Sequence, residues 1–99
     1  MPAKQTFLAA EWSERWKKSY GRLGPEQQAA CDRAVIALTK KQNAPGLRVK
    51  PVRPEKYYLE AGLNPGDRIV FRIEAGTIYF VDVISHDDIG RYGRRKSRR

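Results

Sequence analysis

The chain has 99 residues and a formal net charge of +9, because 20 Lys and Arg stand against 11 Asp and Glu. This length suits one small domain without a deep internal cleft, so any site is expected on an open surface. The charge attracts polyanions, which leaves nucleic acid, an anionic membrane surface or an acidic protein as candidate partners. One cysteine, Cys31, excludes an internal disulfide, and with a single histidine it leaves too few ligands for zinc. No metal and no cofactor are therefore expected.

No apolar run approaches the roughly 20 residues that a bilayer-spanning helix needs, and the N-terminal segment lacks a long apolar stretch. We therefore expect a cytoplasmic protein that has no membrane partner. Residues 1–93 are expected to form one domain, and residues 94–99 a solvated basic tail.

A short β-prone run at residues 4–10 comes before the first expected helix, at residues 11–23. In this helix Trp12, Trp16 and Tyr20 recur every four positions, which places the three rings on one stripe facing the core.

Gly24 and Pro25 suit the end of one helix and the first turn of another, so a second helix is expected over residues 25–42. Its apolar face consists of Cys31, Ala34, Val35 and Leu38. The tight turn between the helices predicts an antiparallel helical hairpin.

From Leu47 the hydrophobic period changes from near 3.6 to near 2, which indicates strands. The expected strands are 47–52, 56–63, 67–73 and 78–85, with turns at NPGD (64–67) and EAGT (74–77). The predicted fold class is α+β: the helical hairpin covers one face of a small antiparallel sheet and leaves the other face open.

Strict alternation along residues 67–73 directs Ile69, Phe71 and Ile73 toward the helices. Arg68 and Arg72 then lie on the open face, which Arg48 and Lys50 of the preceding strand would extend. A face of this kind suits a phosphodiester backbone and an unstacked base. The alternative is that these charges only keep an exposed sheet soluble.

In the last strand, alternation separates Tyr79, Val81 and Val83 from Phe80, Asp82, Ile84 and His86. If the second set shares the face of the arginines, Asp82 can pair with one of them. His86 then ends the strand beside this cluster, although a histidine at a strand end is often an ordinary surface residue. Asp87 and Asp88 are expected to form a turn or an N-cap for a last helical turn.

The order of these segments resembles the RelE/ParE superfamily, the small basic toxins of bacterial type II toxin–antitoxin pairs. The likeness runs from about Lys4 to Arg94, and its most specific parts are YY…NPGDRIVFRI and SHDDIGRY. It implies a toxin that binds a cognate antitoxin in a hetero-oligomer. It also implies one of two activities, cleavage of mRNA on the ribosome or inhibition of DNA gyrase.

Residue by residue, Arg68 falls on the strand arginine of that family, His86 on a position where several members carry an imidazole, and Tyr92 near its C-terminal tyrosine. The resemblance therefore implies catalytic roles for these three residues. The expected substrate-binding residues are Lys50, Arg72, Arg48, Arg91 and Arg94.

The preferred function is a ribosome-dependent, metal-independent mRNA endoribonuclease. The alternatives are a gyrase inhibitor and an attenuated or non-enzymatic RNA-binding protein.

Overall fold

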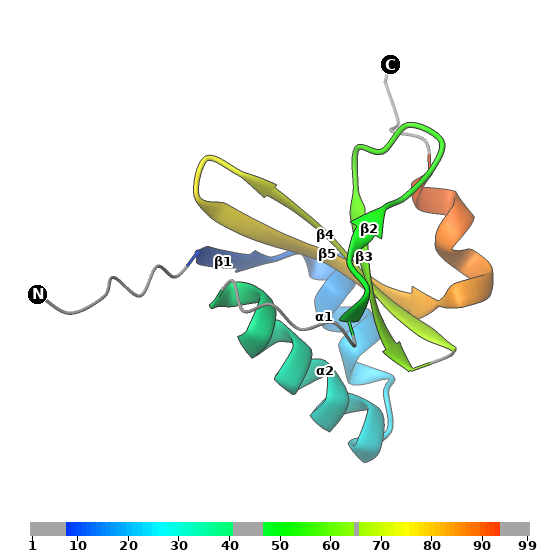
Figure 1. Cartoon of the computed structure of the whole chain (residues 1–99). Helices are drawn as coiled ribbons and strands as arrows, with labels where there is room; N and C mark the ends of the chain where they lie inside the picture. Colours follow the sequence, from blue (N-terminus) through cyan, green and yellow to red (C-terminus); the bar gives the residue numbers. More distant parts are fainter. Residues whose placement is uncertain (1–7, 41–46, 65, 94–99) are drawn as a thin grey trace, which may run out of the picture.

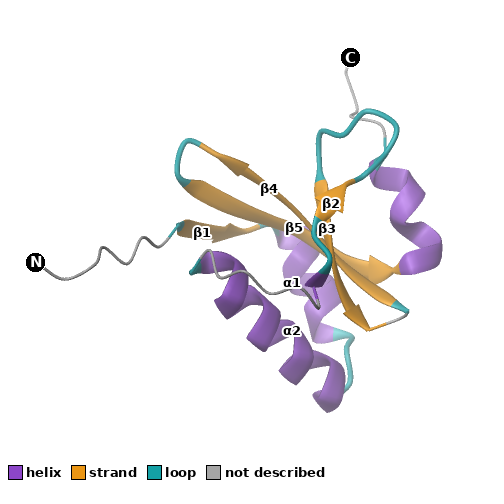
Figure 2. Cartoon of the chain, viewed as in Figure 1, coloured by secondary structure: helices purple, strands orange, loops and turns teal. Residues whose placement is uncertain are grey.

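The computed structural model describes residues 8–40, 47–64 and 66–93, and in this part of the chain it shows one sheet with two α-helices (Figure 1). The elements, coloured by type in Figure 2, are β1 (Ala9–Trp12), α1 (Glu14–Gly21), α2 (Pro25–Thr39), β2 (Lys50–Pro51), β3 (Leu59–Asn64), β4 (Asp67–Glu74), β5 (Thr77–Ser85) and the 3₁₀-helix η2 (His86–Tyr92). The strand order is β1-β5-β4-β3-β2. The α+β class is confirmed.

β1 changes the expected start of the chain. It pairs in parallel with β5, whereas all other neighbours in the sheet are antiparallel. Because this pairing takes residues up to Trp12, α1 begins at Glu14, and the Ser13 side chain caps it by accepting a hydrogen bond from the Trp16 N–H at 2.9 Å. Trp12 is therefore a strand residue, 42% exposed and stacked on Phe80, so its predicted place on the helix stripe is wrong.

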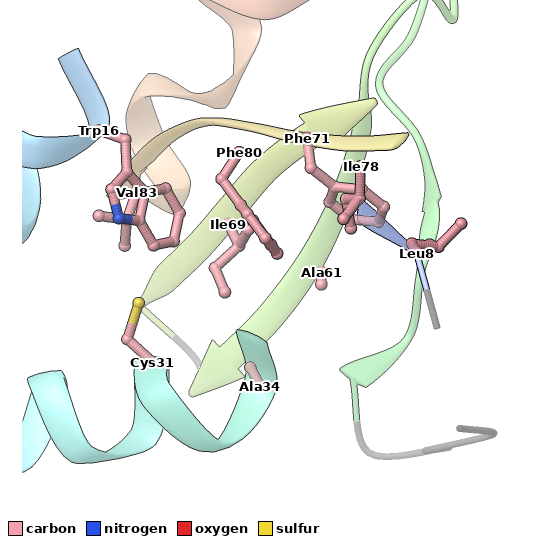
Figure 3. Packing of buried hydrophobic residues seen from close by; sticks show 10 residues of the cluster. All are labelled: Leu8, Trp16, Cys31, Ala34, Ala61, Ile69, Phe71, Ile78, Phe80 and Val83. Atoms are coloured by element: carbon pink, nitrogen blue, oxygen red, sulfur yellow. The ribbon is translucent and has the colours of Figure 1, made fainter. Parts of the chain in front are cut away.

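The main core lies between the sheet and the two helices (Figure 3). α2 begins at Pro25, as predicted, and turns Cys31 and Ala34 inward. Its last predicted turn, residues 40–42, is not helical at Lys40 and otherwise lies outside the described residues. The buried members of the main core are Leu8, Trp16, Cys31, Ala34, Ala61, Ile69, Phe71, Ile78, Phe80 and Val83.

Both predicted turns join neighbouring strands. At the β4–β5 turn, Ala75 and Gly76 have φ angles of 52° and 82°, the left-handed pair of a two-residue hairpin turn. At the β3–β4 turn, the Asn64 side chain accepts hydrogen bonds from the N–H groups of Gly66 and Asp67. The strand predicted over residues 47–52 is shorter than expected and contains Lys50 and Pro51 only.

A β-bulge in β5 reverses part of the predicted alternation. Val70 of β4 lies opposite Asp82, but Phe71 lies opposite Phe80, so Val81 is an extra residue. One extra residue exchanges the two faces of a strand. As a result Phe80 packs in the main core, and Tyr79 lies on the face of Arg72, contrary to the prediction.

The face away from the helices is only partly open. A second cluster of Val52, Val70 and Tyr92 is buried there, with Tyr58, Val81, Ile84 and Ile89 packed against it. η2 and the segment between β2 and β3 pack onto β4 and β5 to form this cluster. Figure 1 shows η2 and that segment side by side. The prediction of a wholly uncovered face is therefore wrong.

Ile73 departs from its predicted place beneath the helices, because it lies near the tip of the β4–β5 hairpin and is 49% exposed. None of the helices in the described ranges is long and apolar enough to cross a membrane.

Candidate functional site

A hollow of about 440 Å³ lies on the face away from the helices, where β2, β3 and β4 are neighbours. In the sheet register Lys50 lies opposite Glu60, and Gly62 lies opposite Arg68. Directly opposed residues lie on the same face of a sheet, so the side chains of Lys50, Glu60 and Arg68 share this face, and Gly62 leaves room beside Arg68. The residues that line it are Arg48, Lys50, Glu60, Gly62, Leu63, Asn64 and Arg68. We call this the basic hollow.

Arg68 is held firmly within the basic hollow. Its Nε lies 3.4 Å from Glu60 Oε1, and its Nη1 donates to the carbonyl oxygens of Asn64 and Asp67 at 2.9 and 3.0 Å. The two charged side chains are 19% and 7% exposed. The guanidinium therefore has a fixed position, which it owes to a buried carboxylate and to the β3–β4 turn.

The charge of the basic hollow is unbalanced. Arg48, Lys50 and Arg68 contribute three positive charges, whereas Glu60 is the single carboxylate among its lining residues. Arg48 and Lys50 are exposed, so their charges face the solvent. A concave surface with excess positive charge attracts an anionic ligand such as a phosphodiester.

His86 lies beside the turn that Arg68 holds. It is the first residue of η2, its side chain is exposed, and its backbone N–H donates to the Gly66 carbonyl oxygen at 2.8 Å. The helical turn predicted here is present, but Ser85 caps it, with its hydroxyl accepting from the Asp87 N–H at 3.1 Å. The acidic pair therefore lies in the first turn of η2 rather than at its cap.

Asp82 does not take the arginine partner that was predicted. It is 1% exposed, and its carboxylate accepts hydrogen bonds from Ser19 Oγ and Tyr92 Oη, each at 2.6 Å, and from the Val83 N–H. Its hydrogen bonds thus tie α1 and η2 to β5. The prediction failed because three neutral donors already bind the Asp82 carboxylate, while Arg68 pairs with Glu60 instead.

Tyr92 faces the second cluster rather than solvent. Its side chain meets Tyr58 edge-on, with ring centroids 5.4 Å apart. Burial, and then the hydrogen bond to Asp82, raise the pKa of Tyr92 above its ordinary value, so the phenol keeps its proton at neutral pH. The catalytic role that the resemblance implies stays a prediction, and the structure gives this residue a packing role.

Two other predicted substrate-binding residues, Arg72 and Arg91, lie outside the basic hollow. Arg72 lies farther along β4 and pairs with Glu74. Arg91 lies in the last turn of η2, 3.9 Å from Asp88, and lines a different cleft of about 330 Å³ together with Arg15 and Arg22. Arg94 lies outside the described residues. The structure therefore gathers Arg48, Lys50 and Arg68 and places Arg72 and Arg91 elsewhere.

Glu60 is the residue of this site that sequence reasoning missed. Its neighbours in YYLEAGL are apolar or small, so in the sequence it looks like an ordinary charge on a strand. The strand register gives the missing signal, because it sets Glu60 opposite Lys50 and beside Arg68.

No family model matches this sequence, and no curated protein does. Solved structures do match. YafQ from E. coli has a TM-score of 0.71 at 12% identity, covering 81% of this chain and 94% of its own. A metal-bound toxin from Helicobacter pylori has a TM-score of 0.66 at 22% identity, covering 82% and 97%.

The toxin–antitoxin complex RelBE2 from Mycobacterium tuberculosis also matches, with a TM-score of 0.65 at 17% identity, covering 81% of this chain and 99% of that one. These likenesses span nearly the whole of each neighbour. The chain therefore has the RelE/ParE-like fold that its sequence resemblance predicted.

Proposed function

We propose that this chain is the toxin of a type II toxin–antitoxin pair and that it acts as a metal-independent endoribonuclease on ribosome-bound mRNA. The observation that carries the proposal is the basic hollow, in which three cations and one buried carboxylate meet on a concave surface. The shared fold supports it, since structural neighbours include a toxin and a toxin–antitoxin complex. A nuclease needs such a concentration of charge at the phosphate, whereas a protein inhibitor does not.

The chemistry needs three groups, for which Glu60 and Arg68 of the basic hollow and His86, whose backbone meets the β3–β4 turn, are the candidates. The 2′-oxygen attacks phosphorus while Glu60 accepts the 2′ proton, and the bond from phosphorus to the 5′-oxygen breaks. His86 gives a proton to that 5′-oxygen. Arg68 opposes the charge that grows on the phosphate. The products are a 2′,3′-cyclic phosphate and a 5′-hydroxyl.

The ribosome contributes the orientation that this shallow site lacks. His86 is exposed at the rim of the sheet, and no described element encloses it. A surface of this kind binds a free strand in many poses, of which few are in line for attack. Holding the mRNA in one geometry can lower the activation free energy by several kcal/mol. Cleavage is therefore expected to depend on the ribosome.

The antitoxin is expected to be acidic where it covers the basic hollow. Arg48 and Lys50 are exposed, and an acidic segment laid across β2 and β3 would neutralise them and exclude RNA. The two chains would then form an inactive hetero-oligomer in the cytoplasm.

The experiment expresses the chain in bacteria without an antitoxin and maps mRNA ends by primer extension. Wild type is expected to arrest growth and to cut translated mRNA. His86→Ala is expected to lower cleavage by about 10²-fold or more, since it removes a proton donor. Lys50→Ala is expected to weaken it less, because this lysine contributes charge only. Arg33→Ala, which removes an exposed charge from α2, is the matched control and should cut as wild type does.

Arg68→Ala is a poorer test, because it leaves the buried Glu60 without its cation and is expected to disturb the fold. Growth arrest with intact mRNA would overturn the nuclease proposal. If the chain also inhibited supercoiling by purified gyrase, the gyrase-inhibitor alternative would replace the nuclease proposal. Salt-dependent RNA binding without cleavage would indicate a non-enzymatic member.

A further inference from the structure

Arg72 lies against two aromatic rings at the far end of the same sheet face. Its guanidinium carbon is 5.1 Å from the ring centroid of Tyr57 and 4.9 Å from that of Tyr79. The second ring comes from the opposed position in β5, and the first from the segment before β3. Both distances fall within the range of cation–π attraction, so the guanidinium holds both rings in place. These three residues are called the aromatic platform.

The charge of Arg72 already has a partner, since its Nη2 pairs with Glu74. A phosphate would have to compete with this carboxylate, whereas the face of a nucleobase carries no net charge and stacks on aromatic rings or guanidinium planes. The aromatic platform therefore suits a base, in contrast to the basic hollow, which suits a phosphate.

Space is available beside the aromatic platform. A hollow of about 420 Å³ adjoins Tyr57 and Arg72, and both tyrosines are partly exposed. The lining residues are Lys56, Tyr57, Leu59, Arg72, Ile73 and Glu74. Lys56 is exposed and adds a positive charge next to the rings, where the backbone attached to a stacked base would run.

The aromatic platform and the basic hollow lie on one strand. Arg68 and Arg72 are four residues apart on β4, about 13 Å at the usual rise of a strand. Val70 lies between them on the same face, buried within the second cluster, so a bound strand would pass over the outer surface of that cluster. A few nucleotides of an extended single strand can cover this distance. We propose that Tyr57, Arg72 and Tyr79 bind one unstacked base of the RNA whose phosphate lies in the basic hollow, an inference that rests on the proposed function.

The test measures binding of the purified chain to a short single-stranded RNA, without ribosomes, so it does not depend on cleavage. The probe carries the fluorescent base 2-aminopurine, and a second RNA of equal length and charge lacks bases. Wild type is expected to quench the fluorescence and to bind the base-bearing RNA about tenfold more tightly than the abasic one. Tyr57→Leu should abolish both the quenching and this preference, and Tyr57→Phe should keep them.

Lys50→Ala is the variant that separates the two proposals. It should weaken the binding of both RNAs to the same extent, because it removes only a charge of the basic hollow. The quenching in the bound complex should stay unchanged. Tyr79→Leu repeats the test from β5 if Tyr57→Leu fails to fold by circular dichroism.

Three results would overturn the proposal that the aromatic platform binds a base. They are equal affinity of wild type for the two RNAs, no RNA binding by wild type, and wild-type quenching in the folded leucine variants. These results leave ribosomal cleavage to be decided by the mRNA mapping. Intact mRNA in that mapping together with a clear base preference here would instead overturn the nuclease and keep the base site.

Discussion

The two faces of the sheet differ in how they are built. The helix-covered face buries the ten residues of the main core, which come from two helices, three strands and Leu8 before β1. Among the described residues, the other face buries a small apolar cluster of Val52, Val70 and Tyr92 and the two carboxylates of Glu60 and Asp82, and the rest of its area carries charged and aromatic side chains. Stability is therefore concentrated on one face, which leaves the other able to carry charges that a core would not accept.

Truncating the main core should have the largest effect. Phe71 is 1% exposed, and Phe71→Ala is expected to lower the free energy of unfolding by about 3–5 kcal/mol, because it removes a buried ring and leaves a cavity. Urea unfolding measures the loss. Ile36→Ala, on an exposed position of α2, is the control and should stay within about 0.5 kcal/mol. A loss below about 1 kcal/mol for Phe71→Ala would contradict the assignment of the main core.

The stability of the second cluster should depend on the hydrogen bond between Tyr92 and Asp82. Tyr92→Phe removes the donor at 2.6 Å from the buried Asp82 carboxylate and is expected to cost about 1.5–3 kcal/mol in urea unfolding. Tyr20→Phe is the matched control, because its hydroxyl donates to Asp32 at an exposed position, where the loss should be smaller. Equal losses in the two variants would show that the Tyr92–Asp82 bond does not anchor η2.

Substitutions at Gly93 and Gly90 test the packing between the end of η2 and the segment before β3. A Cβ on Gly93 would overlap the Arg53 carbonyl oxygen and lie 3.0 Å from Pro54 Cδ, whereas a Cβ on Gly90 meets nothing within 4 Å. Gly93→Ala is therefore expected to cost about 1–3 kcal/mol, and Gly90→Ala much less. Hydrogen exchange should show the loss in η2 and residues 52–58 first. An equal rise in amide exchange across the whole sheet would contradict the view that the main core and the second cluster are stabilised separately.

The last contrast concerns the thiol of the main core, where the expected change is in reactivity rather than in stability. Burial, and then the Asp32 carboxylate, raise the pKa of Cys31 to about 12. The reactive thiolate, whose share rises as the pH approaches the pKa, is therefore scarce at pH 8. Alkylation by iodoacetamide at pH 8 should be at least about a hundredfold slower in the native protein than in urea. Similar rates in the two states would show that α2 does not seal this face.

The same contrast explains what the sequence could predict. Periodicity placed Cys31, Ala34, Ile69 and Phe71 in the main core, because burial on one face repeats along helices and strands. It also put Arg68 and Arg72 together on the opposite face. It could not place Phe80 and Tyr79, since nothing in a single sequence marks the bulge at Val81 that exchanges them.

Pairing across the sheet was the other unpredictable feature. Glu60 was not singled out and Asp82 was given the wrong partner, because strand register decides which charges meet, and register is a property of the assembled sheet. His86 was correctly expected at the end of its strand, where a local signal was enough.

The most direct measurement of the central claim identifies the RNA ends made by the purified chain on ribosomes carrying a defined mRNA. Wild type is predicted to leave 2′,3′-cyclic phosphate and 5′-hydroxyl ends, and Glu60→Gln, which keeps the shape of that side chain, to lower the yield by about a hundredfold or more. Intact mRNA with wild type, or equal yields from the two proteins, would contradict the assignment of the basic hollow as a nuclease site.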